Sequence, residues 1–406
     1  MKLKIHTQIL IAIVLGLITG IIFESQDGKI AFLNIEQIGF IGNLFIRLLK
    51  MIIVPLIFAS IVTGIISLGD TKKLGRIGFK TLIYYLTTTA LAIILGLVIV
   101  NIIRPGVGVL PPDQANDLSQ REAPSITSVI SDIVPENIFA AMAESKVLSI
   151  IFFSILFGAA ICSVGEKARP LASLIEALND VIMKITDWIM RLSPIGIFAL
   201  MAHIVGTMGI DVLKPLLIYM VTVVLGLALH AVIVLPILLK VFGKYSAIKL
   251  IKEVFIAIAT AFSTDSSAAT LPITMECLEV NTGISKKITS FVLPLGATIN
   301  MDGTALYEAV AAMFIAQVYN IDLSFGQQLI IVFTATLASI GAAAIPSAGL
   351  FTLIIVLNAV ELPIEGIAMI WAVDRILDMC RTSVNVWGDA CGTVIVSNLE
   401  QKTINS

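Results

Sequence analysis

Charged residues are scarce in this sequence. Asp, Glu, Lys and Arg together make up 13% of its 406 residues, whereas hydrophobic residues make up 58%. A soluble globular protein carries roughly 25% charged residues, so this chain has too little polar surface to cover a water-facing fold. The deficit excludes an ordinary soluble domain and predicts an integral membrane protein whose solvent is the lipid bilayer.

Cysteine and histidine are also few, which limits metal and redox chemistry. The chain has 4 cysteines and 3 histidines, and neither type is grouped at metal-ligand spacing. The cysteines stand in apolar contexts and are expected to be small buried residues. No tract of basic residues indicates a nucleic-acid partner. The composition therefore indicates no histidine or cysteine metal site and no nucleic-acid partner. We also expect no bound cofactor and no enzymatic activity.

Long apolar runs, by contrast, are plentiful. A transmembrane helix needs about 20 mainly apolar residues, and eight stretches are candidates. They are residues 7–24, 38–68, 81–103, 147–165, 170–208, 214–242, 288–318 and 363–398. No small-residue cleavage site follows the first run, so we interpret it as a retained span rather than a signal peptide. Several runs exceed the length of a perpendicular span, which predicts tilt or breaks.

Two further segments, 246–280 and 324–358, do not fit simple spans. Each is apolar at both ends and small or polar at its centre, so each arm is too short to cross the bilayer. Helical hairpins that enter and leave on one side fit better. Lys286 and Lys287 join the other basic clusters in cytoplasmic loops only if 246–280 re-enters. This topology predicts a multi-pass protein of the cell membrane, inner or plasma, with both termini cytoplasmic.

The C-terminal half thus consists of hairpin, span, hairpin and span, with the hairpins entering from opposite sides. Such an inverted repeat is typical of secondary transporters. Backbone outside regular helices is tolerated at membrane depth only where it is buried in protein or lines a cavity. The pattern predicts an all-α transporter with eight transmembrane helices and two re-entrant hairpins.

The last predicted span carries a stripe of polar residues. At 3.6 residues per turn, the stripe occupies a wedge of about 100° on one helix face. It consists of Asp374, Asp378, Arg381, Thr382, Asn385 and Asp389. Each charge at the membrane centre costs roughly 3 kcal/mol, so the stripe must face a polar interior. A salt-bridged structural face is the alternative, although one Arg cannot pair with three carboxylates.

The preceding span is interrupted by the sequence Gly296-Ala-Thr-Ile-Asn-Met-Asp-Gly-Thr-Ala305. Asn300 and Asp302 beside a glycine predict a break in the helix and offer oxygen ligands, which suit a hard cation. A glycine kink with a capped carboxylate is the alternative. Glu308 follows one turn later, and an acidic group at this depth can gain or lose a proton. Glu308 is therefore a candidate proton carrier.

These motifs resemble the glutamate/aspartate transporter family of sodium:dicarboxylate symporters. The resemblance covers essentially the whole chain, is specific across 260–400 and is only pattern-level before Thr81. The residues that carry it are Asn300-Met-Asp-Gly-Thr304, the Ser-Ser hairpin tip, Ala338-Ser-Ile-Gly341 and Arg381-Thr-x-x-Asn-Val-x-Gly-Asp389.

The resemblance implies a homotrimer that works as an elevator, with a static scaffold and a mobile transport domain. The scaffold would comprise residues 1–68 and 127–208, and the transport domain residues 77–103 and 214–406. The transport domain would contain hairpin 1 (246–280), the seventh span (288–318), hairpin 2 (324–358) and the eighth span (363–398).

The resemblance also implies roles for single residues in binding an acidic amino acid. Arg381 would bind the side-chain carboxylate and Asp378 the amino group. The other substrate-binding positions would be Asn385, Thr382, Thr304, Ser266, Ser267 and Ala344.

Sodium would be the coupling ion, held at three places. One site would use Asp389, Asn385, Gly296 and Asn300. A second would use Asp302, Asn300, Tyr85, Thr88 and Thr89, although threonines in membrane helices often bond only to their own backbone. A third would use the backbone oxygens of Thr298, Ser339, Ile340 and Ala342 beneath hairpin 2, which would act as the gate.

Two alternatives of the same class are a sodium-coupled carrier of neutral amino acids and a carrier of C4-dicarboxylates. The first is expected to lack Arg381 and the second to lack Asp378, so having both favours an acidic amino acid. An ion channel and an intramembrane aspartyl protease are more distant alternatives. An aspartyl protease needs two carboxylates positioned on the same water molecule. The acidic residues here are instead interleaved with Arg, Asn and Thr.

Two positions depart from the family pattern. Archaeal relatives carry an Arg at the hairpin-1 tip where this chain has Asp265, and animal relatives carry an Arg where this chain has Met379. Neither Arg is present here, but Arg375 lies nearby in the sequence. We predict that Asp265 and Arg375 interact and that their interaction alters substrate release.

Overall fold

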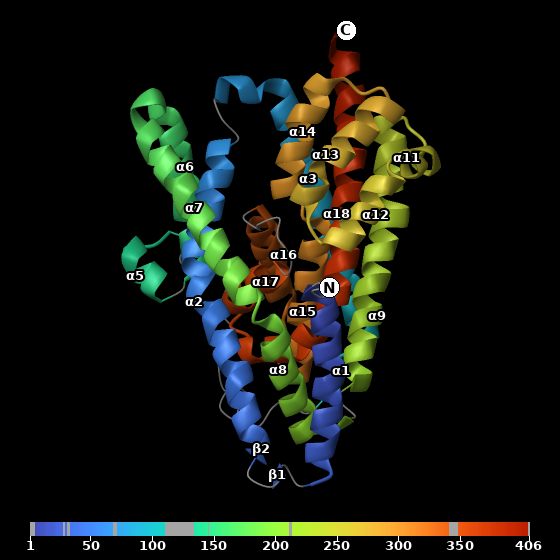
Figure 1. The fold of residues 1–406 in the computed structure, drawn as a ribbon. Coiled ribbons are helices and arrows are strands. Elements are labelled where there is room, and N and C mark those ends of the chain that lie inside the picture. Colours follow the sequence, from blue (N-terminus) through green and yellow to red (C-terminus); the bar gives the residue numbers. More distant parts are fainter. Residues whose placement is uncertain are drawn as a thin grey trace.

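The computed structural model describes residues 5–26, 29–30, 33–67, 71–109, 134–144, 146–210, 213–340 and 348–404. These residues are almost entirely helical (Figure 1). The exception is a two-stranded antiparallel ladder of β1 (Lys29–Ile30) and β2 (Leu33–Asn34), which lies between the first two helices. The all-α prediction is confirmed in these segments.

One group of helices packs around α2 (Ile35–Ser67). Its neighbours are α6 (Val147–Val164), α7 (Arg169–Met190) and α8 (Ser193–Met208), and α1 (Ile5–Glu24) packs along α8. The short helix α5 (Ile138–Ala143) and the 3-10 turn η2 (Gly165–Ala168) adjoin α6. Figure 1 shows these blue and green helices beside one another.

Small residues allow α1 and α8 to approach closely. A methyl group added at Gly16 would lie 2.8 Å from the Phe198 carbonyl oxygen, and one at Gly20 would lie 3.0 Å from that of Ala202. Such small-residue contacts are how helices associate in lipid, where no hydrophobic force drives them together.

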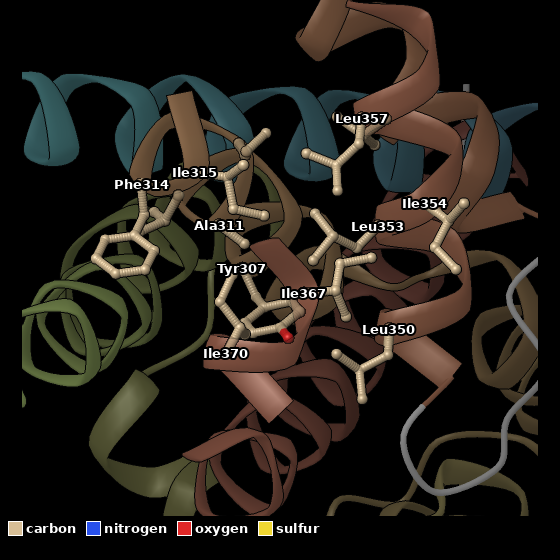
Figure 2. Packing of buried hydrophobic residues seen from close by; sticks show 14 of the residues in the cluster. Tyr307, Ala311, Phe314, Ile315, Leu350, Leu353, Ile354, Leu357, Ile367 and Ile370 are labelled. Carbon is tan, nitrogen blue, oxygen red and sulfur yellow. The ribbon is translucent and has the colours of Figure 1, made fainter. Parts of the chain in front are cut away.

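The second group surrounds α15 (Asp302–Val318), whose side chains are buried almost all round. It contains α3 (Thr71–Ile103), α9 (Leu213–Leu229), α14 (Lys286–Ile299) and α18 (Ile367–Ile404). Beyond α9 the chain continues through η4 (His230–Val234), α10 (Leu235–Leu238) and η5 (Leu239–Gly243). Figure 2 shows Tyr307, Phe314 and Ile315 of α15 packed with leucines of α17 and with Ile367 and Ile370 of α18.

The segment predicted as hairpin 1 folds into α11 (Ala247–Glu253), α12 (Phe255–Thr264), α13 (Ser267–Glu276) and the π turn η6 (Cys277–Asn281). α12 and α13 pack together, and only two residues join them. Asp265 ends α12 with a φ of +52°, and the Ser266 side chain caps α13 by accepting from the Ala269 N–H. The small polar centre of the sequence therefore makes a tight reversal.

The segment predicted as hairpin 2 contains α16 (Phe325–Ile340) and α17 (Ala348–Ala359), which also pack together. Residues 341–347 between them, including Ala342 and Ala344, lie outside the described residues. A 3-10 turn, η7 (Ile364–Gly366), then leads into α18.

The predicted break in the seventh span is confirmed. α14 ends at Ile299 and α15 begins at Asp302, while Asn300 and Met301 have non-helical dihedral angles. The predicted fifth span, 170–208, is also divided, because α7 ends at Met190 and α8 begins at Ser193-Pro194. A proline fits the first turn of a helix but not its interior.

Five helical stretches within the described residues are long and apolar enough to cross a membrane. They are Thr7–Glu24, Ile35–Ile66, Ile77–Ile103, Ser149–Met190 and Leu213–Gly243. α14 and α15 are too short for this criterion because of their break, and α18 carries too many charged residues. The apolar helices are consistent with a membrane protein.

Candidate functional site

The polar stripe of α18 lies inside the molecule. Each of its predicted members is at most 6% exposed, and Arg381 is completely buried. The stripe faces the break between α14 and α15 and the start of α17. Asn300 of the break, Gly303 of α15 and Gly349 of α17 lie directly against the stripe. The sequence prediction that the stripe faces a polar interior is therefore confirmed.

Arg381 is held by two carboxylates and one aromatic ring. Its Nη2 lies 2.8 Å from Asp378 Oδ1 and 3.0 Å from Asp374 Oδ1. The guanidinium carbon lies 3.8 Å from the centre of the Tyr307 ring, in a cation–π arrangement. These contacts fix the orientation of the guanidinium plane.

Two donors of the same guanidinium remain available. Arg381 Nε and Nη1 have no hydrogen-bond partner among the residues that the structure describes. Nη1 lies near the start of α17, since a methyl group added at Gly349 would be 2.6 Å from it. Leaving buried donors of a charged group unpaired is costly, and the guanidinium fork matches a carboxylate. The arrangement can bind an anionic carboxylate between α18 and α17.

A second network joins the α14–α15 break to α18. Asn300 Nδ2 donates to Asp389 Oδ1 at 2.9 Å and to the Asn385 carbonyl at 3.2 Å. Asn385 Oδ1 in turn accepts from the Gly303 N–H at 2.8 Å. Asn300 Oδ1 has no hydrogen-bond partner within the described part of the chain. Four of the residues predicted to bind sodium or substrate therefore meet at one place: Asn300, Gly296, Asn385 and Asp389.

Gly296 shows how closely this network is packed. A methyl group added there would collide with Asp389 Oδ1 and with the Tyr85 hydroxyl. The Tyr85 hydroxyl donates to the Val292 carbonyl at 3.1 Å. Carboxylate, amide and carbonyl oxygens are the ligands of a hard cation, so this donor set fits a sodium ion. Among the described residues, no group of three or more His, Cys, Asp and Glu side chains is arranged to hold a metal.

Asp302 has two buried partners from other helices. Thr89 Oγ1 of α3 donates to Asp302 Oδ1 at 2.7 Å, and His230 Nε2 lies 3.0 Å from Asp302 Oδ2. The sequence analysis singled out Thr89 but set His230 aside as one of three scattered histidines. Its place within a long apolar run was the signal, because an ionisable residue inside a span is a candidate functional residue.

The hydroxyl groups of three other predicted sodium ligands bond to the backbone of their own helices. The Thr88 hydroxyl donates to the Tyr85 carbonyl of its own helix at 3.1 Å, as the backbone-bonded alternative predicts. Thr298 is exposed and donates to the Leu295 carbonyl at 3.0 Å. Ser339 is buried near the end of α16 and donates to the Thr336 carbonyl at 2.8 Å. Ile340 is the last residue of α16.

The other predicted substrate-binding residues come from α13, α15 and α18. Thr304 follows the break, and its hydroxyl is 3.4 Å from Asn385 Nδ2. Ser266 and Ser267 form the start of α13, with Ser267 buried. Thr382 is buried on α18 next to Arg381. Of these residues, Thr304 lies near the guanidinium, since a methyl group added at Gly349 would be 3.1 Å from Thr304 Cγ2 and 2.6 Å from Arg381 Nη1.

Glu308 is completely buried on α15 and contacts α17. The Thr352 hydroxyl donates a hydrogen bond to Glu308 Oε1. Glu308 Oε2 has no partner among the residues that the structure covers. The predicted proton carrier therefore bonds directly to the second helix of hairpin 2.

The predicted interaction between Asp265 and Arg375 is confirmed. Arg375 Nη2 forms an ion pair with Asp265 Oδ2, and both side chains are buried. The pair connects the turn between α12 and α13 to α18. Arg375 Nη1 also lies 3.9 Å from Asp378 Oδ2.

Comparison with known proteins covers nearly the whole chain. The profile of the sodium:dicarboxylate symporter family matches residues 5–399. Excitatory amino acid transporter 3 of Mus musculus is 39% identical, over 97% of this chain and 85% of that protein. The proton/sodium-glutamate symport protein of Geobacillus stearothermophilus is 38% identical, over 98% of this chain and 95% of that protein.

A third relative, the proton/glutamate-aspartate symporter of Escherichia coli strain K12, is 38% identical, over 99% of this chain and 94% of that protein. The resemblance inferred from the motifs is confirmed. The chain belongs to the sodium:dicarboxylate symporter family.

Proposed function

We propose that this chain is a secondary active symporter that imports an acidic amino acid, aspartate or glutamate, together with sodium ions. One observation carries this assignment. Arg381 is completely buried and keeps two guanidinium donors without partners in the described structure. An apolar ligand would leave those donors unpaired, whereas a side-chain carboxylate would accept a charge-assisted hydrogen bond from the guanidinium, for example from Nη1.

The rest of the site distinguishes an amino acid from a simple dicarboxylate. Asp378 lies 2.8 Å from Arg381 and provides an anionic acceptor for an ammonium group. Asn385 and Thr304 lie next to each other, 3.4 Å apart, and would bind the main-chain carboxylate. The relatives named as glutamate and aspartate carriers support the same substrate class.

Sodium coupling follows from the oxygen-rich networks around the α14–α15 break. Asp389 and Asp302 each bring a carboxylate to a helix end where backbone carbonyls are not used by the helix. Sodium bound there would complete the site next to Arg381. Binding of the ion and binding of the substrate would therefore favour each other through shared Asn385.

We further propose eight spans, two re-entrant hairpins, a homotrimer and an elevator motion of the α15-centred group relative to the α2-centred group. The contacts between the two groups support a position in which the α15-centred group is displaced along α2. In the proposed topology Ile35 is at the external end of α2, and Lys50 lies about 22 Å further along that helix. Lys50 Nζ is 3.6 Å from Glu365 Oε1 in the external turn before α18.

Phe45 of α2 also packs edge-on against Trp371 of α18, with ring centres 5.1 Å apart. The external end of the second group therefore lies deep along α2. Figure 1 shows α16 and α17 beside the middle of α2 rather than beside the β1–β2 turn. We propose that this is the inward position of the transport domain.

Transport by purified protein in proteoliposomes tests the proposed function. Uptake of labelled aspartate and glutamate is measured while inward gradients of Na⁺, H⁺ and K⁺ are varied separately. We expect an inward Na⁺ gradient to drive accumulation, and serine and succinate to compete weakly. If sodium drove neither acidic amino acid, the proposal would be wrong. Native mass spectrometry of the 43.5 kDa chain would test the trimer separately.

Proton co-transport through Glu308 is a second part of the proposal. Glu308 bonds to Thr352 of α17, so gain or loss of its proton would change the contact that holds hairpin 2 against α15. Glu308→Gln keeps the shape but cannot titrate. We expect its uptake to depend less on external pH than that of the unmodified chain, and an unchanged pH profile would refute this role.

A further inference from the structure

Five charged side chains form one buried cluster between hairpin 1 and α18. They are Asp265, Asp374, Arg375, Asp378 and Arg381, and each is at most 6% exposed. Two positive charges and three negative charges leave the cluster with a formal charge of −1. Burying unpaired charge is costly, so the pairing within the cluster decides which carboxylate remains available to a ligand.

Arg375 lies between two carboxylates of this cluster. It forms its ion pair with Asp265, while its other terminal nitrogen is 3.9 Å from Asp378 Oδ2. Asp265 Oδ1 and Arg375 Nε have no hydrogen-bond partner among the described residues. The two side chains therefore depend on each other, and Asp378 is the next carboxylate within reach of Arg375.

We propose that Asp265 determines substrate specificity by pairing with Arg375 and so limiting the approach of Arg375 to Asp378 to 3.9 Å. Asp378 then keeps its acceptor capacity for the ammonium group of an amino acid. The proposal rests on the proposed function and adds a positioning residue to it. Asp265 itself need not touch the substrate, since it acts through Arg375.

The consequence of removing Asp265 follows from the charges. Without that carboxylate, Arg375 would be buried without a partner and would move the short distance to Asp378. It would then compete with the substrate ammonium for the same oxygens. The cluster would also become neutral, two positive against two negative charges. Both effects disfavour an amino acid relative to an amine-free dicarboxylate, which carries no ammonium group and a full double negative charge.

Binding measurements on purified protein in a sodium-containing buffer test this inference. Dissociation constants for L-aspartate and for succinate are measured by isothermal titration calorimetry. For Asp265→Asn we expect aspartate affinity to fall roughly ten- to a hundredfold, the value of a charge-assisted hydrogen bond. Succinate affinity should stay constant or rise. The double variant Asp265→Asn/Arg375→Met removes the competitor and should restore aspartate binding.

Ser263→Ala is the matched control, because Ser263 is exposed on the same hairpin and donates only to the Thr260 carbonyl. It should leave both constants unchanged. Equal weakening of aspartate and succinate in Asp265→Asn would indicate a merely structural role and overturn the inference. So would a double variant that remains as weak as the single one. Failure of the unmodified chain to bind aspartate would instead refute the proposed function, and this inference with it.

Discussion

In the proposed function, substrate choice depends most directly on Arg381. Replacing it with Gln removes the charge and the fork, so two charge-assisted hydrogen bonds to the side-chain carboxylate are lost. We expect aspartate affinity to fall by about 3 kcal/mol or more, roughly a hundredfold or more. Arg381→Lys keeps the charge without the fork, so its aspartate affinity should lie between those of the unmodified chain and Arg381→Gln.

The measurement is competition of unlabelled aspartate and serine against labelled substrate. Serine lacks the side-chain carboxylate, so the preference for aspartate over serine should collapse in Arg381→Gln. A preserved preference would show that another group binds that carboxylate.

Thr89 offers a test of the sodium network at the scale of one hydroxyl. Thr89→Val removes its hydrogen bond to Asp302 and leaves a buried carboxylate less well satisfied. We expect sodium binding to weaken by about 1 kcal/mol. This corresponds to a roughly fivefold higher sodium concentration for half-maximal uptake. Thr81→Val is the control, because Thr81 is a buried threonine of the same helix that bonds only to the Ile77 carbonyl.

Single residues were predictable from the sequence where their chemistry is out of place in an apolar chain. The charges of α18 and the Asn300–Asp302 pair are of this kind, and so is the departure at Asp265 and Arg375. Partners that depend on tertiary packing were not predictable. Tyr307 beneath Arg381 and His230 beside Asp302 come from elements whose approach no local pattern encodes.

Close approach of α15 and α18 depends on a glycine just beyond the helix break. A methyl group added at Gly303 would lie 2.7 Å from the Arg381 carbonyl oxygen and 3.0 Å from its Cα. Because backbone atoms cannot move aside cheaply, we expect Gly303→Ala to lower the free energy of unfolding by roughly 1–3 kcal/mol. Gly64→Ala is the matched control in helix α2, since nothing lies within 4 Å of its added methyl group.

Thermal unfolding of both variants in detergent measures the difference. Gly64→Ala should raise the stability slightly, because alanine is the better helix former by about 1 kcal/mol. A Gly303→Ala variant as stable as its Gly64 counterpart would mean that α15 and α18 separate easily.

Secondary-structure elements were predicted well where sequence periodicity and composition agree. The hairpin with a polar tip at Asp265 and the break at Asn300 both appear as expected. The helix ends were less accurate, since α18 begins at Ile367 and continues to Ile404 rather than spanning 363–398. Helix α5 escaped prediction, because six residues between polar segments carry no clear period.

The arrangement of whole groups of helices lies beyond what the sequence encodes locally. An elevator protein has at least two arrangements of nearly equal free energy, and the same apolar surfaces must pack in both. In the proposed elevator, the contact between Lys50 and Glu365 belongs to one of them. Both side chains are partly exposed, so this ion pair contributes at most about 1 kcal/mol. Such a weak contact can form in one position of the α15-centred group without preventing that group from moving to another.

This contact yields the final prediction. With the four native cysteines replaced, Lys50→Cys and Glu365→Cys are joined by a short bifunctional thiol reagent. If the α15-centred group must move past α2 during each cycle, the cross-link should stop uptake of labelled aspartate almost completely, and reductive cleavage of the linker should restore it. Each single-cysteine variant treated with the same reagent is the control. Full cross-linking with normal uptake would show that these two groups need not separate, and the elevator motion would then be excluded.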